Sequence, residues 1–516
     1  MKACIINPPA QVKKEKFEEW SDNSIHNVQY LGIAYLESSL LAEGYEVTLY
    51  DCPSEGIDLS SLFEKLENSK YSVIGISVFY YNLFNFERIL YFIEKRLPDT
   101  YVFIGGYAPT LDYQNMLRTH KFVKAIILGE GEKSTVELFQ NLKSGNNQWK
   151  KTKGMAYLED DIVKINYQTE CISLDDLPFP LHQLRNKCQS ISMLTSRGCY
   201  GNCSFCSEKS FSMYTKGTRI RYRSVKNVIE ELDIVSLSLK PKSISFCDSN
   251  FMPATEDRKR WITEFLHKLL VNRYDIKFNA LLRSNDVLFY EELLPMFKKA
   301  GFSYFFIGIE SFIQRQLDFY EKNITVENNI KAIKVMIKSG ISIEFGFLML
   351  DPFTSISEIR ENLLILDNLN IYNSIHYTQE FFSLGAVVFS VSGTKIYKEI
   401  HEKGIEESNA IGYHFINANV ELYYERLKEW IRVLREYKYI KFLIDKCYYY
   451  DEKELAVILK KCIVEIYKLD VKFMLELLKV FIDENSTKEL VYINKRKLED
   501  IYNKYSRYIE CVISIK

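Results

Sequence analysis

Residues 199–206 read Cys199-Tyr-Gly-Asn-Cys203-Ser-Phe-Cys206, which places three thiols within one short loop. The loop follows an apolar segment, Ser190–Leu194, that we expect to be a strand. Three thiols so close in sequence can bind one small ligand only if the loop wraps around it. Cysteine thiolates are the usual ligands of iron–sulfur clusters. Three cysteines would leave one iron of a four-iron cluster without a protein ligand, open to a small molecule.

Two other interpretations of these cysteines stay open. A structural zinc site needs four protein ligands, usually in two separated pairs, and the nearest spare side chains, His182 and Cys188, have the wrong spacing. A disulfide would leave an odd thiol and suits an oxidising compartment. The spacing therefore favours a cluster with three protein ligands.

With Phe205 between its last two cysteines, the C-x3-C-x2-C spacing resembles the signature of the radical S-adenosylmethionine (radical SAM) superfamily. The resemblance implies that Cys199, Cys203 and Cys206 hold a [4Fe–4S] cluster and that Phe205 lies beside SAM. In that family SAM chelates the open iron, and an electron from the cluster cleaves SAM to a 5′-deoxyadenosyl radical. The motif indicates how a radical is generated and leaves the substrate open.

Length, charge and cysteine usage limit the class of protein. A chain of 516 residues is longer than one hydrophobic core usually supports, so two or three domains are expected. The 67 basic and 68 acidic residues nearly cancel, so neither nucleic acid nor membrane is expected as a partner. No apolar run approaches the ~20 residues that span a bilayer, and the first apolar run is too short for a signal peptide. We therefore expect a cytoplasmic protein whose scattered cysteines are small buried side chains, namely Cys4, Cys52, Cys171, Cys447, Cys462 and Cys511.

Residues 1–145 alternate short apolar runs with amphipathic helical patterns, which predicts an α/β domain with a doubly wound, Rossmann-like parallel sheet. The expected strands are Lys2–Asn7, Glu46–Asp51, Val73–Val78, Val102–Gly105 and Ala125–Leu128. The expected helices are Gly32–Glu43, Leu59–Asn68, Phe84–Arg96 and Glu132–Leu142. Ligands of such sheets bind beyond the carboxyl ends of the strands, where this sequence has glycines and Ser77. Glycines at these ends also suit the tight turns of any doubly wound domain, so both interpretations stay open.

The pieces Leu31-Gly-Ile-Ala-Tyr-Leu-Glu-Ser-Ser-Leu, Gly44-Tyr-Glu-Val, Gly75-Ile-Ser, Gly105-Gly and Gly129-Glu-Gly-Glu together resemble the cobalamin-binding domain that precedes many radical SAM domains. The resemblance implies that cobalamin contacts five residues: Ser77, Gly105, Gly106, Gly129 and Glu130. The D-x-H-x-x-G loop, whose His ligates cobalt in other cobalamin proteins, does not follow the first strand, and His26 lies outside such a pattern. The lower axial ligand therefore stays undefined.

Residues 146–185 are expected to be a linker with a small β segment (Met155–Leu158 and Ile162–Ile165), and residues 186–390 a radical SAM domain. From Ile191 onward at least five strand–helix units predict a partial (β/α) barrel. The expected strands after the loop are Ser243–Cys247, Lys277–Leu282, Tyr304–Ile309 and Ser342–Met349. The expected helices are Arg258–Asn272, Tyr290–Ala300, Val326–Lys338 and Ile356–Leu369.

Polar residues at the carboxyl ends of these strands suit the ammonium, carboxylate and ribose groups of SAM. The segments Phe246-Cys-Asp-Ser-Asn, Leu-Leu-Arg283 and Gly-Ile-Glu310-Ser311 also resemble strand-end motifs of the family. The resemblance implies that Asp248 and Asn250 lie near the amino group of SAM, Arg283 near its carboxylate, and Glu310 with Ser311 near its ribose. Each residue taken singly could instead be a helix cap or part of a salt bridge. Cys247 is expected to be a buried strand thiol.

Residues 391–516 change to long amphipathic helical patterns, expected at Val420–Tyr437, Glu452–Tyr467 and Val471–Asp483. Some radical enzymes use tyrosine as a hydrogen-atom relay, but nothing singles out one of 36 tyrosines, and no catalytic side chain is assigned.

The combined resemblance implies a cobalamin-dependent radical SAM enzyme, most simply a methyltransferase acting on an unactivated carbon of a small-molecule or peptide substrate. Its cofactors would be the [4Fe–4S] cluster, SAM and cobalamin, with an external electron donor such as flavodoxin or ferredoxin. A radical SAM enzyme for a rearrangement, cyclisation or oxidation, with or without cobalamin, is the main alternative. A non-catalytic iron–sulfur protein is a remote one.

Overall fold

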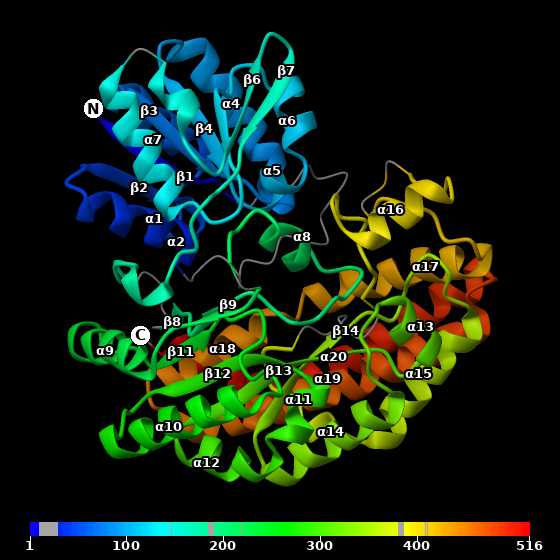
Figure 1. The fold of residues 1–516 in the computed structure, drawn as a ribbon. Coiled ribbons are helices and arrows are strands. Elements are labelled where there is room, and N and C mark those ends of the chain that lie inside the picture. The colour runs from blue at the N-terminus through cyan, green and yellow to red at the C-terminus, as the bar shows by residue number, and fades with distance from the viewer. Residues whose placement is uncertain are drawn as a thin grey trace. The chain divides into compact units, whose positions relative to one another are not determined.

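The computed structural model describes residues 1–9, 29–145, 147–183, 190–217, 219–379, 386–407, 409 and 411–515 (Figure 1). His26 and Cys188 lie outside these residues. The chain forms two compact units. The first comprises Met1–Gly201, Cys206–Phe251 and Val391–Lys398, and the second comprises Asn202–Phe205, Met252–Ser390 and Glu399–Lys516.

The first unit contains a seven-stranded sheet with the order β2-β1-β3-β4-β5-β6-β7. Its strands are β1 (Ala3–Asn7), β2 (Val47–Asp51), β3 (Val73–Ser77), β4 (Tyr101–Gly105), β5 (Ala125–Ile127), β6 (Met155–Glu159) and β7 (Ile162–Asn166). The first five pair in parallel, as expected from the strand–helix alternation. The small β segment expected in the linker is the antiparallel hairpin β6–β7, which pairs with β5 and extends this sheet at one edge.

Helices cover both faces of this sheet because alternate residues of each strand point to opposite sides. On one face Ile5 and Phe103 pack with α1 (Leu31–Ala42) and α7 (Glu132–Ser144). On the other face Ile74 and Ile104 pack with two further helices, α3 (Leu59–Ser69) and α4 (Leu83–Arg96). The short helices α2 (Cys52–Glu55), α5 (Tyr107–Leu111) and α6 (Tyr113–Thr119) fill the remaining connections. The predicted doubly wound sheet is confirmed.

The first unit also holds the strands on either side of the cysteine loop. The strand β8 (Ser190–Met193) pairs in parallel with β11 (Ser243–Phe246), and β9 (Ser196–Arg197) pairs antiparallel with β10 (Arg221–Tyr222). Two helices belong here, α8 (Glu208–Ser212) and α9 (Val225–Ser238), and the latter was not among the expected helices.

In the second unit, three parallel strands alternate with helices. The strand β13 (Phe302–Glu310) pairs with β12 (Lys277–Arg283) on one side and β14 (Ser342–Phe347) on the other. The helices of this part are α10 (Glu256–Asn272), α11 (Ser284–Phe289), α12 (Leu294–Lys299), α13 (Gln314–Phe319), α14 (Val326–Ser339) and α15 (Ile356–Leu369). Counting β8 and β11 of the first unit, five strands of the chain are each followed by a helix, as predicted.

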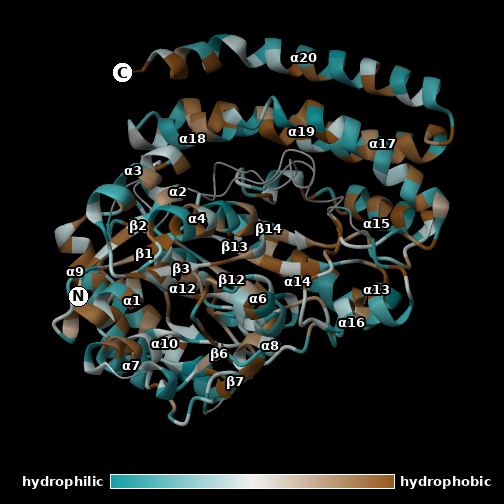
Figure 2. Ribbon diagram, turned by 90° about the horizontal axis from the view of Figure 1, so that it is seen from above, coloured by the Kyte–Doolittle hydropathy of each residue, from teal (hydrophilic) through white to brown (hydrophobic). Residues whose placement is uncertain are grey.

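The C-terminal region is helical, as expected, but two predicted boundaries are wrong. Its helices are α16 (Lys395–Glu402), α17 (Ala418–Arg435), α18 (Tyr439–Tyr449), α19 (Lys453–Val480) and α20 (Glu484–Ser514). The two expected helices between Glu452 and Asp483 are the single helix α19, because no Gly or Pro interrupts the pattern there. Helix α20 was not predicted. Figure 2 shows apolar and polar residues interspersed along α19 and α20, which pack against each other.

The scattered cysteines are only partly buried. Cys4, Cys52, Cys447 and Cys462 are buried as expected, whereas the expectation is wrong for Cys171 and Cys511, which are exposed. Within the described part of the chain, no helix is both long and apolar enough to cross a membrane.

A buried carboxyl group inside the helical region gives a pH-dependent prediction. Asp470 of α19 accepts a hydrogen bond from Trp430 Nε1 at 3.0 Å, and both side chains are almost fully buried. Burial raises the pKa of Asp470 to about 8, although Trp430 and Lys441 act in the opposite direction. The pKa of an unfolded aspartate is about 3.9, so between about pH 4 and pH 8 the folded chain holds a proton that the unfolded chain releases. The free energy of unfolding should therefore fall as the pH rises through this range.

We expect Asp470→Asn to remove this dependence, because the amide keeps an oxygen for Trp430 and cannot ionise. The variant should gain on the order of 1–3 kcal/mol over the natural chain at pH 8 and much less at pH 4.5, measured by thermal melting. Asp500→Asn, on the exposed side of α20, is the control and should show no such trend. Parallel melting temperatures of Asp470→Asn and the natural chain across this pH range would contradict the assignment.

Candidate functional site

A cavity of about 300 Å³ lies in the first unit at the carboxyl ends of β3, β4 and β5. All five residues expected at the cobalamin site line it: Ser77, Gly105, Gly106, Gly129 and Glu130. The segment Leu194–Gly198 before the cysteine loop also contributes to the wall, as does helix α8 just after it. One cavity is therefore bounded by the predicted corrinoid residues and by both flanks of the cysteine loop.

Two glycines of this wall, Gly75 and Gly106, are required by close packing. Gly106 has φ +103°, and a Cβ there would lie 2.7 Å from the backbone oxygen of Val78. A Cβ on Gly75 would lie 2.4 Å from the ring of Phe103. The tight-turn interpretation is therefore correct for Gly106, and the same lack of side chains leaves space at the strand ends.

Four buried charges join the turn after β5 to the two short strands beside the loop. Arg197 lies 2.6 Å from Glu132 and 3.2 Å from Glu130, and Arg221 also pairs with Glu130. Burial alone would raise the pKa of Glu132, but Arg197 holds it below its usual value. The pKa of Arg197 shifts the other way. Burial would lower it, but Glu132 and Glu130 favour the charged form and raise it. The network fixes the orientation of Arg197, two residues before Cys199.

An aromatic side chain links the N-terminal sheet to α8. The hydroxyl of Tyr107 donates to Glu208 Oε2 at 2.8 Å, and its ring stacks on Phe211 at 4.2 Å between centroids. Burial, reinforced by Glu208, raises the pKa of Tyr107 well above its usual value. Tyr107 is thus a neutral hydrogen-bond donor in the cavity wall.

The polar atoms of this wall fit a corrinoid, which carries several carboxamide side chains. Oε2 of Glu132 and the hydroxyl of Thr135 line the cavity, are buried, and have no hydrogen-bond partner among the residues that the structure describes. Buried polar groups of this kind are costly unless a ligand or water pairs with them. Carboxamide N–H groups would satisfy both, so the residues present suit such a ligand.

The cysteine loop is partly open to solvent. Cys199 and Cys203 are half-buried and Cys206 is exposed, and the backbone N–H of Gly201 donates to Cys199 Sγ at 3.3 Å. Within the described ranges, no three His, Cys, Asp or Glu side chains form a site for one metal ion. In a four-iron cluster each cysteine thiolate ligates a different iron, so the cluster does not require three side chains around one ion.

At the end of β11, Asp248 and Cys247 differ in their surroundings. The carboxylate of Asp248 is fully buried and accepts hydrogen bonds from the backbone N–H and hydroxyl of Thr195 and from the hydroxyl of Ser196. It therefore holds the segment that leads into the cysteine loop. The expectation that Cys247 is a buried thiol is wrong, because this side chain is exposed in the cavity wall, although the surrounding protein atoms still raise its pKa.

In the second unit, the predicted SAM residues Arg283 and Glu310 end neighbouring strands. Glu310 Oε1 lies 2.6 Å from Lys322 Nζ, with both side chains buried, and Arg283 Nη1 lies 3.2 Å from Cys203 Sγ. The ring of Phe205 meets Tyr320 edge to face at 5.6 Å. Cys203, Phe205, Arg283 and Glu310 are thus tied to one framework of the second unit.

The remaining two SAM candidates are buried. Ser311 is fully buried, and its hydroxyl lies within hydrogen-bond distance of Gln316 and Asn362 and accepts from the backbone N–H of Ile313. Its hydroxyl is therefore engaged within the protein. Asn250 is almost fully buried in the first unit.

Several wall residues escaped the sequence analysis. Tyr107 and Thr135 carry no motif, and their position depends on the fold around them. Arg197 and Glu132 had a weaker signal. Arg197 precedes the cysteine loop by two residues, and Glu132 stands in the quoted Gly129-Glu-Gly-Glu segment, but their pairing is known only from the structure.

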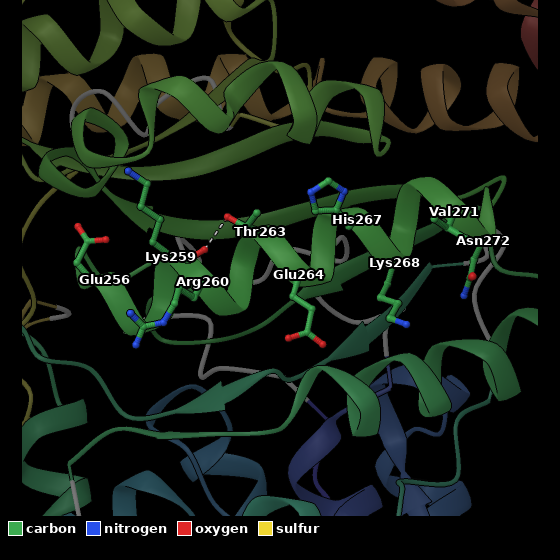
Figure 3. Close-up of a pocket in the computed structure, with 9 residues that line it drawn as sticks. All are labelled: Glu256, Lys259, Arg260, Thr263, Glu264, His267, Lys268, Val271 and Asn272. Carbon is green, nitrogen blue, oxygen red and sulfur yellow. Dashed lines mark hydrogen bonds between the residues drawn. The ribbon is translucent and has the colours of Figure 1, made fainter.

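A second hollow lies along α10 in the second unit (Figure 3). It is lined by one side of this single helix, from Glu256 to Asn272, and the side chains drawn are mostly charged and splay apart. It contains none of the predicted site residues.

Comparison with known proteins gives two family matches. Residues 24–139 match the B12 binding domain, and residues 193–366 match the radical SAM superfamily. The first match covers most of the seven-stranded sheet, and the second begins at the end of β8 and includes the cysteine loop.

Similar proteins carry different activities in their names. An uncharacterized methyltransferase from Pyrococcus horikoshii is 28% identical over 349 residues, which cover 66% of this chain and 73% of that protein. An anaerobic magnesium-protoporphyrin IX monomethyl ester cyclase from Rubrivivax gelatinosus is 28% identical over 331 residues, 61% of this chain and 58% of that protein. The structure of OxsB, a cobalamin-dependent S-adenosylmethionine radical enzyme with aqua-cobalamin and SAM bound, superposes with a TM-score of 0.73 at 19% identity, covering 100% of this chain and 81% of OxsB. At that identity the likeness concerns the fold.

The backbone turn at Gly198, which leads into the cysteine loop, can be tested by mutation. Gly198 has φ +88°, and a Cβ there would lie 1.8 Å from the backbone oxygen of Arg219, which cannot move aside cheaply. We expect Gly198→Ala to displace Cys199 and to lower the iron bound after anaerobic reconstitution to less than about a quarter of the natural chain's content. Gly404→Ala is the matched control, because Gly404 also has positive φ (+63°) but a Cβ there meets nothing within 4 Å. Equal iron content in both variants would show that the loop does not depend on this turn.

Proposed function

Because this chain is a radical SAM protein with an N-terminal B12 binding domain, we propose that it is a cobalamin-dependent radical SAM methyltransferase. Its substrate would be an unactivated carbon of a small molecule or peptide, and a flavodoxin or ferredoxin would supply electrons. The observation that carries the proposal is the single cavity lined by the five predicted corrinoid residues and by both flanks of the cysteine loop. Such a cavity would let one substrate reach both the methyl donor and the group that generates the radical.

When bound, the reduced [4Fe–4S] cluster supplies the electron that cleaves SAM, and the corrinoid supplies the methyl group. Cys199, Cys203 and Cys206 would hold the cluster, and Glu130 with Glu132 would accept hydrogen bonds from the corrinoid. The buried carboxylate of Glu310, which lies 2.6 Å from Lys322 Nζ, suits the ribose hydroxyls of SAM.

The residues that line the cavity would also orient the substrate and shield it. Tyr107 offers a neutral phenol, and the paired charges of Arg197 and Glu132 leave little net field in the wall. A restricted, water-poor cavity protects reactive species from side reactions. We assign residues 1–145 to the corrinoid domain, 146–185 to a linker, 186–390 to the radical SAM domain and 391–516 to a helical domain.

A second candidate function is a reaction of the same cofactors without methyl transfer. It is supported by the similar protein from Rubrivivax gelatinosus, which is named a cyclase. The two candidates differ in the fate of the methyl group of SAM, and this difference can be measured before the substrate is known.

The test is anaerobic incubation of the reconstituted protein with methyl-labelled SAM and a low-potential reductant. A methyltransferase should place the label in the corrinoid fraction and form one S-adenosylhomocysteine for each methyl group transferred. Formation of 5′-deoxyadenosine with no label in the corrinoid would favour the second candidate. Absence of both products would reject both functions.

The cysteine assignment is tested separately from corrinoid binding. We expect Cys203→Ala to abolish 5′-deoxyadenosine formation, by at least about 100-fold, because one ligand of the cluster is lost. Corrinoid uptake should persist, since the cavity residues all belong to the first unit and Cys203 does not. Cys511→Ala, which removes an exposed thiol of α20, should behave as the natural chain. Full SAM cleavage by Cys203→Ala would refute the ligand assignment.

A further inference from the structure

Arg283, at the end of β12, is bonded to the cysteine loop. Its Nη1 donates to Cys203 Sγ at 3.2 Å, and its Nη2 donates to the backbone oxygen of Lys322. The side chain is only 6% exposed, so the guanidinium is largely withdrawn from water. A planar guanidinium with fixed donors can hold two acceptors at once, which a lysine cannot do in the same geometry.

The acceptor Lys322 is itself fixed by a buried ion pair. Its Nζ lies 2.6 Å from Glu310 Oε1, and Glu310 has the positive φ of +62° where the pairing of β13 with β14 shifts register. A Cβ on Gly308 would lie 2.5 Å from Glu310 Oε1 and 2.7 Å from Lys322 Nζ. The missing side chain at Gly308 therefore makes room for this pair, which holds the Lys322 backbone in place for Arg283.

The loop residues next to Cys203 are anchored to the same segment of chain. The backbone N–H of Ser204 donates to the carbonyl of Tyr320 at 2.9 Å, and its hydroxyl donates to the carbonyl of Phe319 at 2.7 Å. Tyr320 also donates its hydroxyl to the carbonyl of Leu348 at 2.8 Å. Residues 319–322 thus form a bracket for the cysteine loop, and Arg283 connects this bracket to a thiol.

We infer that Arg283 is a positioning residue for the cluster ligand Cys203 and sets the reduction potential of the cluster. This inference rests on the proposed function, because it takes Cys203 as a ligand. Reduction adds one electron, and therefore one negative charge, to the cluster. A cationic N–H···S bond stabilises that charge, so it favours the reduced form that SAM cleavage requires. This role differs from the SAM-carboxylate contact expected from the sequence.

The test is a redox titration of the reconstituted full chain in the absence of SAM, with iron content, corrinoid uptake and the spectrum of the reduced cluster measured alongside. In Arg283→Met we expect the ratio of reduced to oxidised cluster at a fixed poise to fall at least about tenfold, which is 59 mV for a one-electron couple. Arg283→Lys should fall between, because it keeps the charge but cannot bridge both acceptors. Arg273→Met, at the exposed end of α10, is the control and should match the natural chain.

Each outcome decides the assignment. Unchanged potentials in both Arg283 variants, with iron retained, would overturn the inference. Loss of iron from both variants with normal corrinoid uptake would support it, because the thiol is then no longer held. Failure of the proposed function looks different: the natural chain itself would bind no four-iron cluster.

Discussion

Four buried charges hold the cavity of the first unit together. Glu130 and Glu132 follow β5, while Arg197 and Arg221 lie on the antiparallel strands β9 and β10. Removing ions from water is costly, and in a buried network this cost is offset only when every ion meets its counterpart in good geometry. The turn after β5 and the strand before Cys199 are therefore constrained together. The cavity wall therefore carries paired charges of both signs together with the neutral donor Tyr107.

The cysteine loop is held in place by two different sets of interactions, one before Cys199 and one around Cys203. Before Cys199, the chain is held by charge and by a backbone approach at Gly198 that admits no side chain. Around Cys203, it is held by hydrogen bonds to the carbonyls of Phe319 and Tyr320 and by Arg283. A backbone carbonyl accepts a hydrogen bond whatever the side chain of its residue. The segment 319–322 can therefore hold the cysteine loop through its backbone conformation alone. The side chains that do carry specificity there are Arg283 and the Glu310–Lys322 pair.

The sequence predicted most of what local periodicity and motifs encode. Five strands of the N-terminal sheet followed from the alternation of apolar runs and helical patterns, because this signal is local. The five residues that the resemblance placed at the cobalamin site line one cavity. The prediction divided the continuous helix α19 between Tyr467 and Val471. This stretch contains Asp470, whose burial against Trp430 depends on a partner 40 positions away. Cys247 was misjudged for a related reason, since exposure inside a cavity depends on which walls face the strand end.

The same distinction applies to Arg283, whose predicted contact with the SAM carboxylate stays a prediction and whose partners in the structure are Cys203 and the carbonyl of Lys322. A strand-end motif predicts that the guanidinium lies near the SAM region, and it does share a framework with Glu310 and Phe205. It does not predict which acceptor the guanidinium chooses, because that choice depends on the carbonyl of Lys322, which is positioned by a salt bridge across the end of β13. A buried arginine must satisfy several donors at once, so its partners are set by whichever acceptors the fold holds rigid. Here the rigid acceptors are a thiol and a backbone carbonyl, and both belong to the support of the cysteine loop.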